Sequence, residues 1–345
     1  VDGFGSIIVN GVRYALDAAA LDVAAPAGLQ WGMTVRVRGR IDSSRGEGVA
    51  AAVSSAPELR GTAARPEPDG SFSLLGTRVS VEPSTVWDGL RGPADLAEGL
   101  PVLAYGLPGP AGQLRATRIE RIASAAAPVL TGTVQDLRPD QQRFRLGEQL
   151  IDFASARFAP PLARAALAEG LLVRITADTV PPAGAPLMAA TVEPWHPRPV
   201  GEGQPLSLSG LVTDQAGGLR FRLLGVTVDA VGATITGGPT QAVGNGVRVE
   251  ATGVVHQGVL VAQRLALRHG PGGGGPVQFS VRGAIGQFQG VQAFRVQGQP
   301  VDASGSAVRF VGGSAADLRN GRRVSVTGSR VGEGMLLAEE LRFEP

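Results

Sequence analysis

The sequence contains neither cysteine nor lysine, and aromatic residues make up only 5% of its 345 residues. Without cysteine it can form neither a disulfide framework nor a thiolate metal site. Without lysine it cannot hold a P-loop, and no HExxH or GxSxG motif occurs. All 32 basic residues are therefore arginines, and 30 acidic residues oppose them. The net charge of +2 is close to neutral and does not predict a strongly basic, nucleic-acid-binding surface.

Long apolar runs are also missing. No segment reaches the roughly 20 apolar residues that a helix needs to cross a bilayer. The sequence opens with Val1-Asp2-Gly3 rather than with a signal peptide, so we expect the targeting segment of an exported protein to lie outside it. The 50 glycines and 25 prolines are too many for a helical protein, and 43% hydrophobic residues are too many for a disordered one.

What the sequence does contain is one pattern written five times. Each copy has an aliphatic residue, a glycine three positions later, a valine three positions after that, two alternating apolar residues and a small residue. The five copies are Leu29/Gly32/Val35/Val37/Gly39, Leu96/Gly99/Val102/Ala104/Gly106, Leu167/Gly170/Val173/Ile175/Ala177, Val243/Gly246/Val249/Ala251/Gly253 and Leu318/Gly321/Val324/Val326/Gly328. The identical spacing predicts five tandem repeats: repeat 1 (2–57), repeat 2 (58–125), repeat 3 (129–195), repeat 4 (206–268) and repeat 5 (277–345).

Within each repeat the local pattern is that of strands. Apolar and polar residues alternate, as in Val35-Arg36-Val37-Arg38, and this period of two half-buries a strand. Helix-like segments are short and precede the fourth strand, at Leu162–Glu169, Pro93–Glu98 and Ser314–Leu318. We therefore predict an all-β protein of five small five-stranded OB-like barrels, each with one helical turn. Pro/Gly-rich linkers are expected at 123–128, 196–205 and 268–276.

The repeats also resemble a known family. The opening Gly3-Phe4-Gly5-Ser6-Ile7-Ile8-Val9-Asn10-Gly11-Val12-Arg13-Tyr14 and the Leu-x-x-Gly-x-x-Val-x-Val-x-Gly stretch resemble bacterial exported proteins built from the domain-of-unknown-function 5666 repeat. The resemblance is strongest in repeats 1, 4 and 5, and repeat 3 departs most, with Ala177 and Pro181-Pro182. It implies an extracytoplasmic location in the periplasm, on the outer membrane or at the cell surface. It carries over no catalytic residue.

Residues that recur between repeats are the candidates for function. Asp152, Asp229 and Asp302 follow the third strand and could bind a cation, but Asp more often caps a turn at such positions. Arg145, Arg222 and Arg295 follow the phenylalanine of the second strand; we interpret them as a solvated face, with a basic stripe as the alternative.

The remaining candidates do not recur. His196, His256 and His269 lie in separate loops, whereas a zinc site needs three or four convergent ligands. Trp31, Trp87 and Trp195 occupy different places in their repeats, which favours core or interface roles over a base-stacking platform. Gly272–Gly275 has no strand before it and no helix after it, so we interpret it as linker. The sequence therefore predicts no catalytic, cofactor or metal site.

Two functions remain open at this point. The first is a non-enzymatic envelope or extracellular scaffold, or a self-associating filament subunit. The second is a module that binds a glycan or single-stranded nucleic acid. Since strand edges template pairing, apolar segments near both ends (Ile7-Ile8-Val9 and Leu341-Arg342-Phe343) predict head-to-tail contacts between repeats 1 and 5 of neighbouring subunits. The alternative is that both strands complete their own barrels.

Overall fold

The fold was obtained as a computed structural model. It describes residues 6–9, 12–16, 19–23, 28–42, 47–110, 112–125, 127–182, 184–195, 201–215, 217–268, 279–296 and 298–344. The described chain is all-β, as predicted, and its helical content is four single 3-10 turns: η1 (Pro93–Asp95), η2 (Arg164–Ala166), η3 (Thr240–Ala242) and η4 (Ala315–Asp317). Each turn directly precedes the signature aliphatic residue of repeats 2 to 5. In repeat 1 the corresponding residues are 26–28, of which 26 and 27 lie outside the described ones.

The strands form four sheets rather than five separate barrels. Repeat 1 forms a sheet of β1 (Ser6–Val9), β2 (Val12–Ala15), β3 (Ala20–Val23), β4 (Arg36–Asp42) and β5 (Glu47–Ser55). Repeat 4 forms a sheet of β19 (Pro205–Leu211), β20 (Arg220–Leu223), β21 (Val226–Asp229), β22 (Thr234–Thr236), β23 (Arg248–His256) and β24 (Val259–Leu267). Repeat 5 forms a sheet of β25 (Phe279–Gly290), β26 (Ala293–Val296), β27 (Gln299–Asp302), β28 (Arg309–Val311), β29 (Arg323–Gly328), β30 (Arg330–Gly332), β31 (Met335–Leu337) and β32 (Glu340–Phe343).

Repeats 2 and 3 share the fourth, 13-stranded sheet, which corrects the prediction of five tandem barrels. Its strands are β6 (Leu59–Ala64), β7 (Phe72–Leu74), β8 (Thr77–Ser80), β9 (Val86–Asp88), β10 (Pro101–Pro108), β11 (Gln113–Arg121), β12 (Val129–Arg138), β13 (Arg143–Leu146), β14 (Gln149–Asp152), β15 (Arg157–Phe158), β16 (Leu172–Thr176), β17 (Leu187–Met188) and β18 (Thr191–Pro194). The sheet is continuous because β12 pairs with β6, Leu130 opposite Leu59. Both leucines are fully buried, and one hydrophobic core runs through the two repeats.

Backbone geometry explains the signature of the repeat. The five signature glycines (Gly32, Gly99, Gly170, Gly246 and Gly321) have φ between +76° and +82°, a region that disfavours side chains. The small signature residue of the fourth strand lies against the fifth strand. A Cβ at Gly39, Gly106, Gly253 or Gly328 would come within 2.0–2.4 Å of a carbonyl oxygen there. At the first three of these glycines a bulge shifts the strand register.

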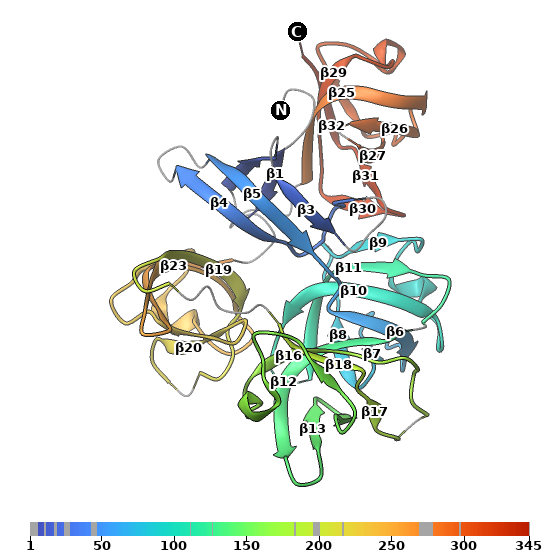
Figure 1. Ribbon diagram of the computed structural model, residues 1–345. Helices are drawn as coiled ribbons and strands as arrows, with labels where there is room; N and C mark the ends of the chain where they lie inside the picture. The colour runs from blue at the N-terminus through green and yellow to red at the C-terminus, as the bar shows by residue number, and fades with distance from the viewer. Residues whose placement is uncertain are drawn as a thin grey trace.

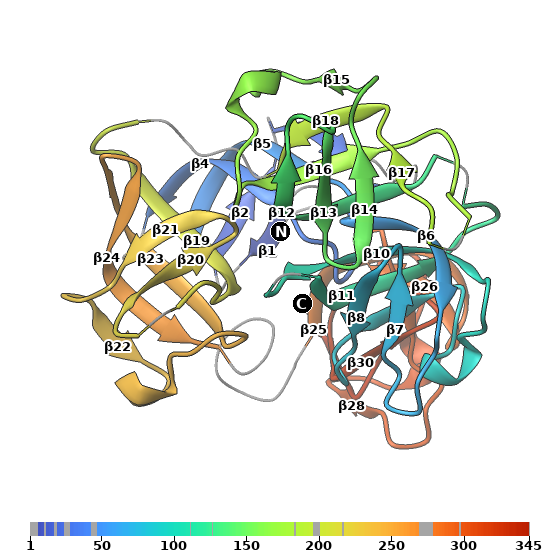
Figure 2. The ribbon, with the colours of Figure 1, turned by 90° about the horizontal axis from the view of Figure 1, so that it is seen from below.

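The repeats do not form a linear string. Figures 1 and 2 show repeat 4 (yellow to orange) on one side of the molecule, and repeat 5 (orange to red) beside repeats 1 and 2. Repeats 1 and 5 touch within the one chain: the Trp31 and Phe279 rings meet edge to face with centroids 5.7 Å apart, and Gln299 Nε2 donates to the Leu29 carbonyl at 3.2 Å. No helix among the described residues is long and apolar enough to span a membrane.

Candidate functional site

The recurring aspartates cap turns, as expected. The Oδ1 atoms of Asp152, Asp229 and Asp302 accept hydrogen bonds from the backbone N–H two residues later, at 3.1, 3.1 and 2.8 Å. In the first two, Oδ2 also accepts a bond from an arginine on the facing strand, Arg143 Nε at 3.1 Å and Arg220 Nε at 2.9 Å. These carboxylates are therefore occupied within their own hairpins.

The recurring arginines also contact the backbone. Arg145 Nη1 donates to the Glu148 carbonyl at 2.9 Å, and Arg295 Nη1 donates to the Gly298 carbonyl at 2.6 Å, so both brace their own hairpin turns. Arg222 Nη1 reaches across to repeat 3 and donates to the Gly170 carbonyl at 2.8 Å. The interpretation of these arginines as a solvated face is wrong for Arg222, because it joins two repeats.

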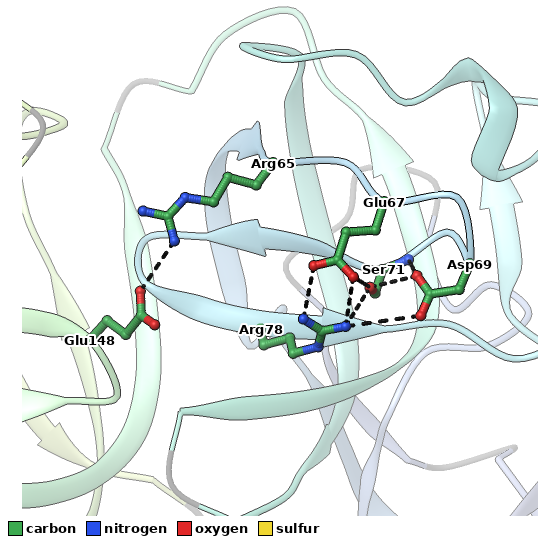
Figure 3. Close-up of polar contacts among 6 residues, drawn as sticks. All are labelled: Arg65, Glu67, Asp69, Ser71, Arg78 and Glu148. Atoms are coloured by element: carbon green, nitrogen blue, oxygen red, sulfur yellow. Dashed lines mark hydrogen bonds and ion pairs between the residues drawn. The ribbon is translucent and has the colours of Figure 1, made fainter.

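The outer face of the first three strands differs between repeats 2 and 3, and we call it the hairpin face. In repeat 2 it carries the Arg78 cluster (Glu67, Asp69, Ser71 and Arg78), shown in Figure 3. The Arg78 guanidinium donates to both oxygens of Glu67 at 2.9 Å and to Ser71 Oγ at 2.9 Å. Ser71 in turn donates its N–H and its hydroxyl to Asp69, at 2.9 and 2.6 Å. Both carboxylates of the Arg78 cluster therefore have partners within it, and the one guanidinium pairs with both.

Hydrogen bonding shifts the acidities within the Arg78 cluster. The bonds from Arg78 hold the pKa of Glu67 below its ordinary value, and the Ser71 hydroxyl and N–H do the same for the pKa of Asp69. The pKa of Arg78 is raised by its bond to Glu67. The charged cluster thus joins residues of one hairpin through hydrogen bonds and ion pairs.

In repeat 3 the hairpin face is a hollow of about 220 Å³, which we call the Arg138 hollow. It is lined by Asp136, Arg138, Gln141, Arg143, Arg145 and Leu150. Arg138 lies directly opposite Arg143 in the antiparallel pair of β12 and β13. Like charges in that position destabilise a strand pair.

Charge is also buried where repeats 1, 2 and 5 meet, at what we call the Arg118 junction. Arg118, in β11, is 1% exposed; it pairs with Asp88 and Glu120 and donates Nη1 to the Trp31 carbonyl of repeat 1 at 3.0 Å. Gly334 of repeat 5 donates its N–H to the carbonyl of the neighbouring Trp87 at 2.7 Å. Burial, with a contribution from Glu120, raises the pKa of the nearby Tyr105 to about 12.

A second buried contact joins repeats 2 and 3. Trp195 Nε1 donates to Glu58, a fully buried carboxylate at the start of the shared sheet, at 2.6 Å. The Arg174 guanidinium lies over the Trp195 ring, 4.6 Å from its centroid. All three tryptophans thus lie where repeats meet, which confirms the expected core or interface role.

Among the histidines, His256 forms an ion pair with Glu202 through Nδ1. His196, His269 and Gly272–Gly275 lie outside the described residues. Within the part of the chain that is described, no three His, Asp or Glu side chains come together as a metal site would require.

Comparison with known protein families finds a match. The model of the domain of unknown function DUF5666 matches residues 62–120 and 282–342, that is, most of repeat 2 and of repeat 5. The chain therefore contains two regions of the DUF5666 family. Repeats 1 and 4, where we expected the strongest resemblance to DUF5666 besides repeat 5, lie outside the matched regions. No curated protein matches the chain.

Sequence reasoning missed the Arg78 cluster, the Arg138 hollow and the Arg118 junction. The first two lie beside a backbone feature that only the structure shows: a non-glycine residue with φ of about +50° recurs at the same position, as Arg65, Asp136, Asp214 and Gln287. The charged residue two positions after it is Glu67 in repeat 2 and Arg138 in repeat 3. The repeat pattern does not single out the junction either, because the position of Arg118 varies: it is Arg264 in repeat 4, but Ala52, Thr191 and Glu340 in repeats 1, 3 and 5.

Proposed function

We propose that this protein is a non-catalytic scaffold of the bacterial envelope or cell exterior, in which five DUF5666 repeats form one cross-braced body. The observation that carries the proposal is the Arg118 junction. A guanidinium taken out of water is tolerated only when partners satisfy it, and here they hold repeats 1 and 2 together beside repeat 5. A buried guanidinium with several partners would keep the repeats in a fixed arrangement, as a scaffold protein that transmits load or fixes spacing requires.

The strand order of the repeat supports the OB-type interpretation as part of this proposal. In repeat 2, β10 pairs with both β11 and β6, and β8 pairs with β11 in parallel. The order β6-β7-β8-β11-β10 therefore returns to its start, as it does in a five-stranded Greek-key unit. Because repeats 2 and 3 share a sheet, the OB-type unit here is a strand order and not an isolated barrel.

Self-association is the second part of the proposal. The contact between repeats 1 and 5 within one chain leaves fewer surfaces for the head-to-tail contact predicted above, and β32 pairs with both β29 and β28. Among the described strands, β1 pairs with β2 alone and is an edge of its sheet. An unpaired edge is a template for a strand of another subunit. We propose β1 as the contact between subunits.

Proline substitution tests this edge. Val9 and Val12 face each other across a two-residue connection, so the Val9 N–H is directed at β2 and the Ile8 N–H at the open side. Ile8→Pro is expected to abolish assembly, measured by size exclusion with light scattering, while the melting temperature stays near that of the parent. Deletion of Val1–Ser6 should weaken assembly as well. A parent chain that is monomeric at high concentration, or an Ile8→Pro variant that still assembles, contradicts the proposal.

Ligand binding through an exposed repeat face is the second candidate function. It cannot rest on tryptophan stacking, because Trp87 is buried and Trp31 and Trp195 are half-buried. The observation that favours it is the Arg138 hollow.

A further inference from the structure

The Arg138 hollow has an unusual charge arrangement. Three guanidinium groups and one carboxylate, that of Asp136, line it, together with Gln141 and the apolar side chain of Leu150. The Arg138 side chain makes no hydrogen bond or ion pair with any residue that the structure describes. Its strand neighbour across the hollow is Arg143. Asp152 pairs with Arg143, but no carboxylate among the described residues pairs with Arg138.

The other two arginines keep donors available. Arg143 uses Nε for Asp152, which leaves its two terminal nitrogens. Arg145 uses Nη1 for the Glu148 carbonyl and places Nε 3.8 Å from Asp136, which leaves Nη2. With Arg138, the hollow thus offers several N–H donors from three side chains. Such forked donors match the oxygens of phosphate and sulfate groups.

Repeat 2 shows what the same face looks like when the protein neutralises it. On the first strand the register aligns Ala63 with Val134, and therefore Glu67 with Arg138. On the next two strands it aligns Phe72 with Phe144, and therefore Arg78 with Leu150. In repeat 2 the guanidinium of this face binds the Glu67 carboxylate through both oxygens. In repeat 3 the position of that carboxylate is taken by another arginine. Repeat 3 therefore has no carboxylate at the position where repeat 2 has that of Glu67.

Repeat 4 has part of the same arrangement of arginines. Arg220 pairs with Asp229 as Arg143 pairs with Asp152, and Arg222 corresponds to Arg145. Arg222, however, is directed to Gly170 of repeat 3, and the sequence has Ala216 where repeat 3 has Arg138. Arg220 is therefore a matched control: it corresponds to Arg143, but its repeat lacks the counterpart of Arg138.

We propose that the Arg138 hollow binds a tetrahedral oxyanion, a phosphate or sulfate group, held between Arg138, Arg143 and Arg145. The group occupies the space between the two facing cations and removes their repulsion. Leu150 and Gln141 lie beside it and contact whatever carries the group, which gives a sugar ester a second point of contact. This site is independent of the scaffold proposal, because it involves neither β1 nor the Arg118 junction.

The experiment is calorimetric titration of the full chain with sodium sulfate, sodium phosphate and glucose 6-phosphate, at ionic strength matched with sodium chloride. Glucose serves as the uncharged control. Saturable binding of at least one anion is expected, and Arg138→Gln should weaken it at least about tenfold, the effect of losing a hydrogen bond to a charged group. Arg220→Gln should leave the affinity unchanged.

The arms also separate the two sources of the oxyanion. Tighter binding of glucose 6-phosphate than of inorganic phosphate identifies an ester group as the ligand, and equal binding identifies the free ion. Arg138→Gln removes a like-charge pair, so the variant should fold, and its circular dichroism and melting curve check this. No saturable binding of any of the three anions, or equal weakening by Arg138→Gln and Arg220→Gln, overturns the proposal.

Discussion

Repeats 2 and 3 share one sheet and one core, yet their hairpin faces carry opposite solutions to the same charge problem. In repeat 2, Arg78 is matched by Glu67 and Asp69 of the same hairpin. In repeat 3, three arginines surround a hollow in which the lining supplies one carboxylate, that of Asp136. Glycines and buried aliphatic residues therefore fix the backbone of the repeat, whereas the charged side chains of its outer face can differ from one repeat to the next.

The two repeats also differ at the small signature residue of the fourth strand. Repeat 2 has Gly106, where a Cβ would lie 2.4 Å from the Arg115 carbonyl oxygen. Repeat 3 has Ala177, which is buried and already accommodates its Cβ. The pairing of β16 with β12 and β18 ends one residue earlier, at Thr176. Repeat 3 has therefore avoided the close approach that forces glycine on repeat 2.

Substitutions at Gly106 and Ala177 should differ most in their effect on stability. Gly106→Ala should cost about 3 kcal/mol, the upper range for overpacking, because the contact is with backbone rather than with a movable side chain. Ala177→Gly should cost only about 1 kcal/mol, the conformational cost of replacing an alanine with glycine. Urea unfolding monitored by tryptophan fluorescence measures both. Equal losses for the two variants would mean that the bulge of repeat 2 can relax.

The features that depend on the local backbone could be predicted from the sequence, and those that depend on side-chain placement could not. The all-β class, the turn before the fourth strand and the turn-capping role of Asp152 were predictable, because they depend on local backbone requirements that recur. The Arg78 cluster depends on which side chains a strand register places on one face. The contact between Trp31 and Phe279 depends on how distant repeats pack, and no periodic pattern encodes it.

Acid should sharpen the contrast between the two faces. The pKa values of Glu67 and Asp69 are lowered in the folded protein, so below their ordinary value of about 4 the unfolded chain binds more protons. The stability that the Arg78 cluster contributes is therefore present above about pH 4 and is lost as the pH falls through the lowered folded values. Glu67→Gln should remove part of this loss.

Melting temperatures of the parent chain and of Glu67→Gln, measured from pH 6 down to pH 2.5, test this. The difference between the two curves isolates the cluster from other carboxylates of lowered pKa, such as Asp229 and Glu340. The parent should be the more stable at pH 6, and the two curves should converge in acid. Parallel curves would show that the bonds of Arg78 to Glu67 do not contribute to folding.

The smallest expected effect concerns the ion pair that joins the two hairpin faces. Figure 3 shows the ion pair between Arg65 and Glu148. Arg65 Nη1 lies 3.6 Å from Glu148 Oε2, but both side chains are about three-quarters exposed, at 77% and 74%. Glu148→Ala should change the free energy of unfolding by less than about 0.5 kcal/mol, because exposed pairs are screened by water and salt. The Glu148 N–H, which donates to the Gly76 carbonyl at 3.2 Å, is kept in the variant.

Backbone contact, not charge, holds the two hairpin faces together. Gly147 has a φ of +57°, and a Cβ there would lie 2.6 Å from Gly112 Cα of repeat 2. Gly147→Ala should therefore destabilise the contact between repeats 2 and 3 far more than Glu148→Ala, although it changes no charge. Hydrogen exchange at the amides of β8 and β14 separates the two: faster exchange is expected for Gly147→Ala alone. If Glu148→Ala accelerated exchange as much, the ion pair would be the principal contact, and the hairpin faces would be coupled through their charges after all.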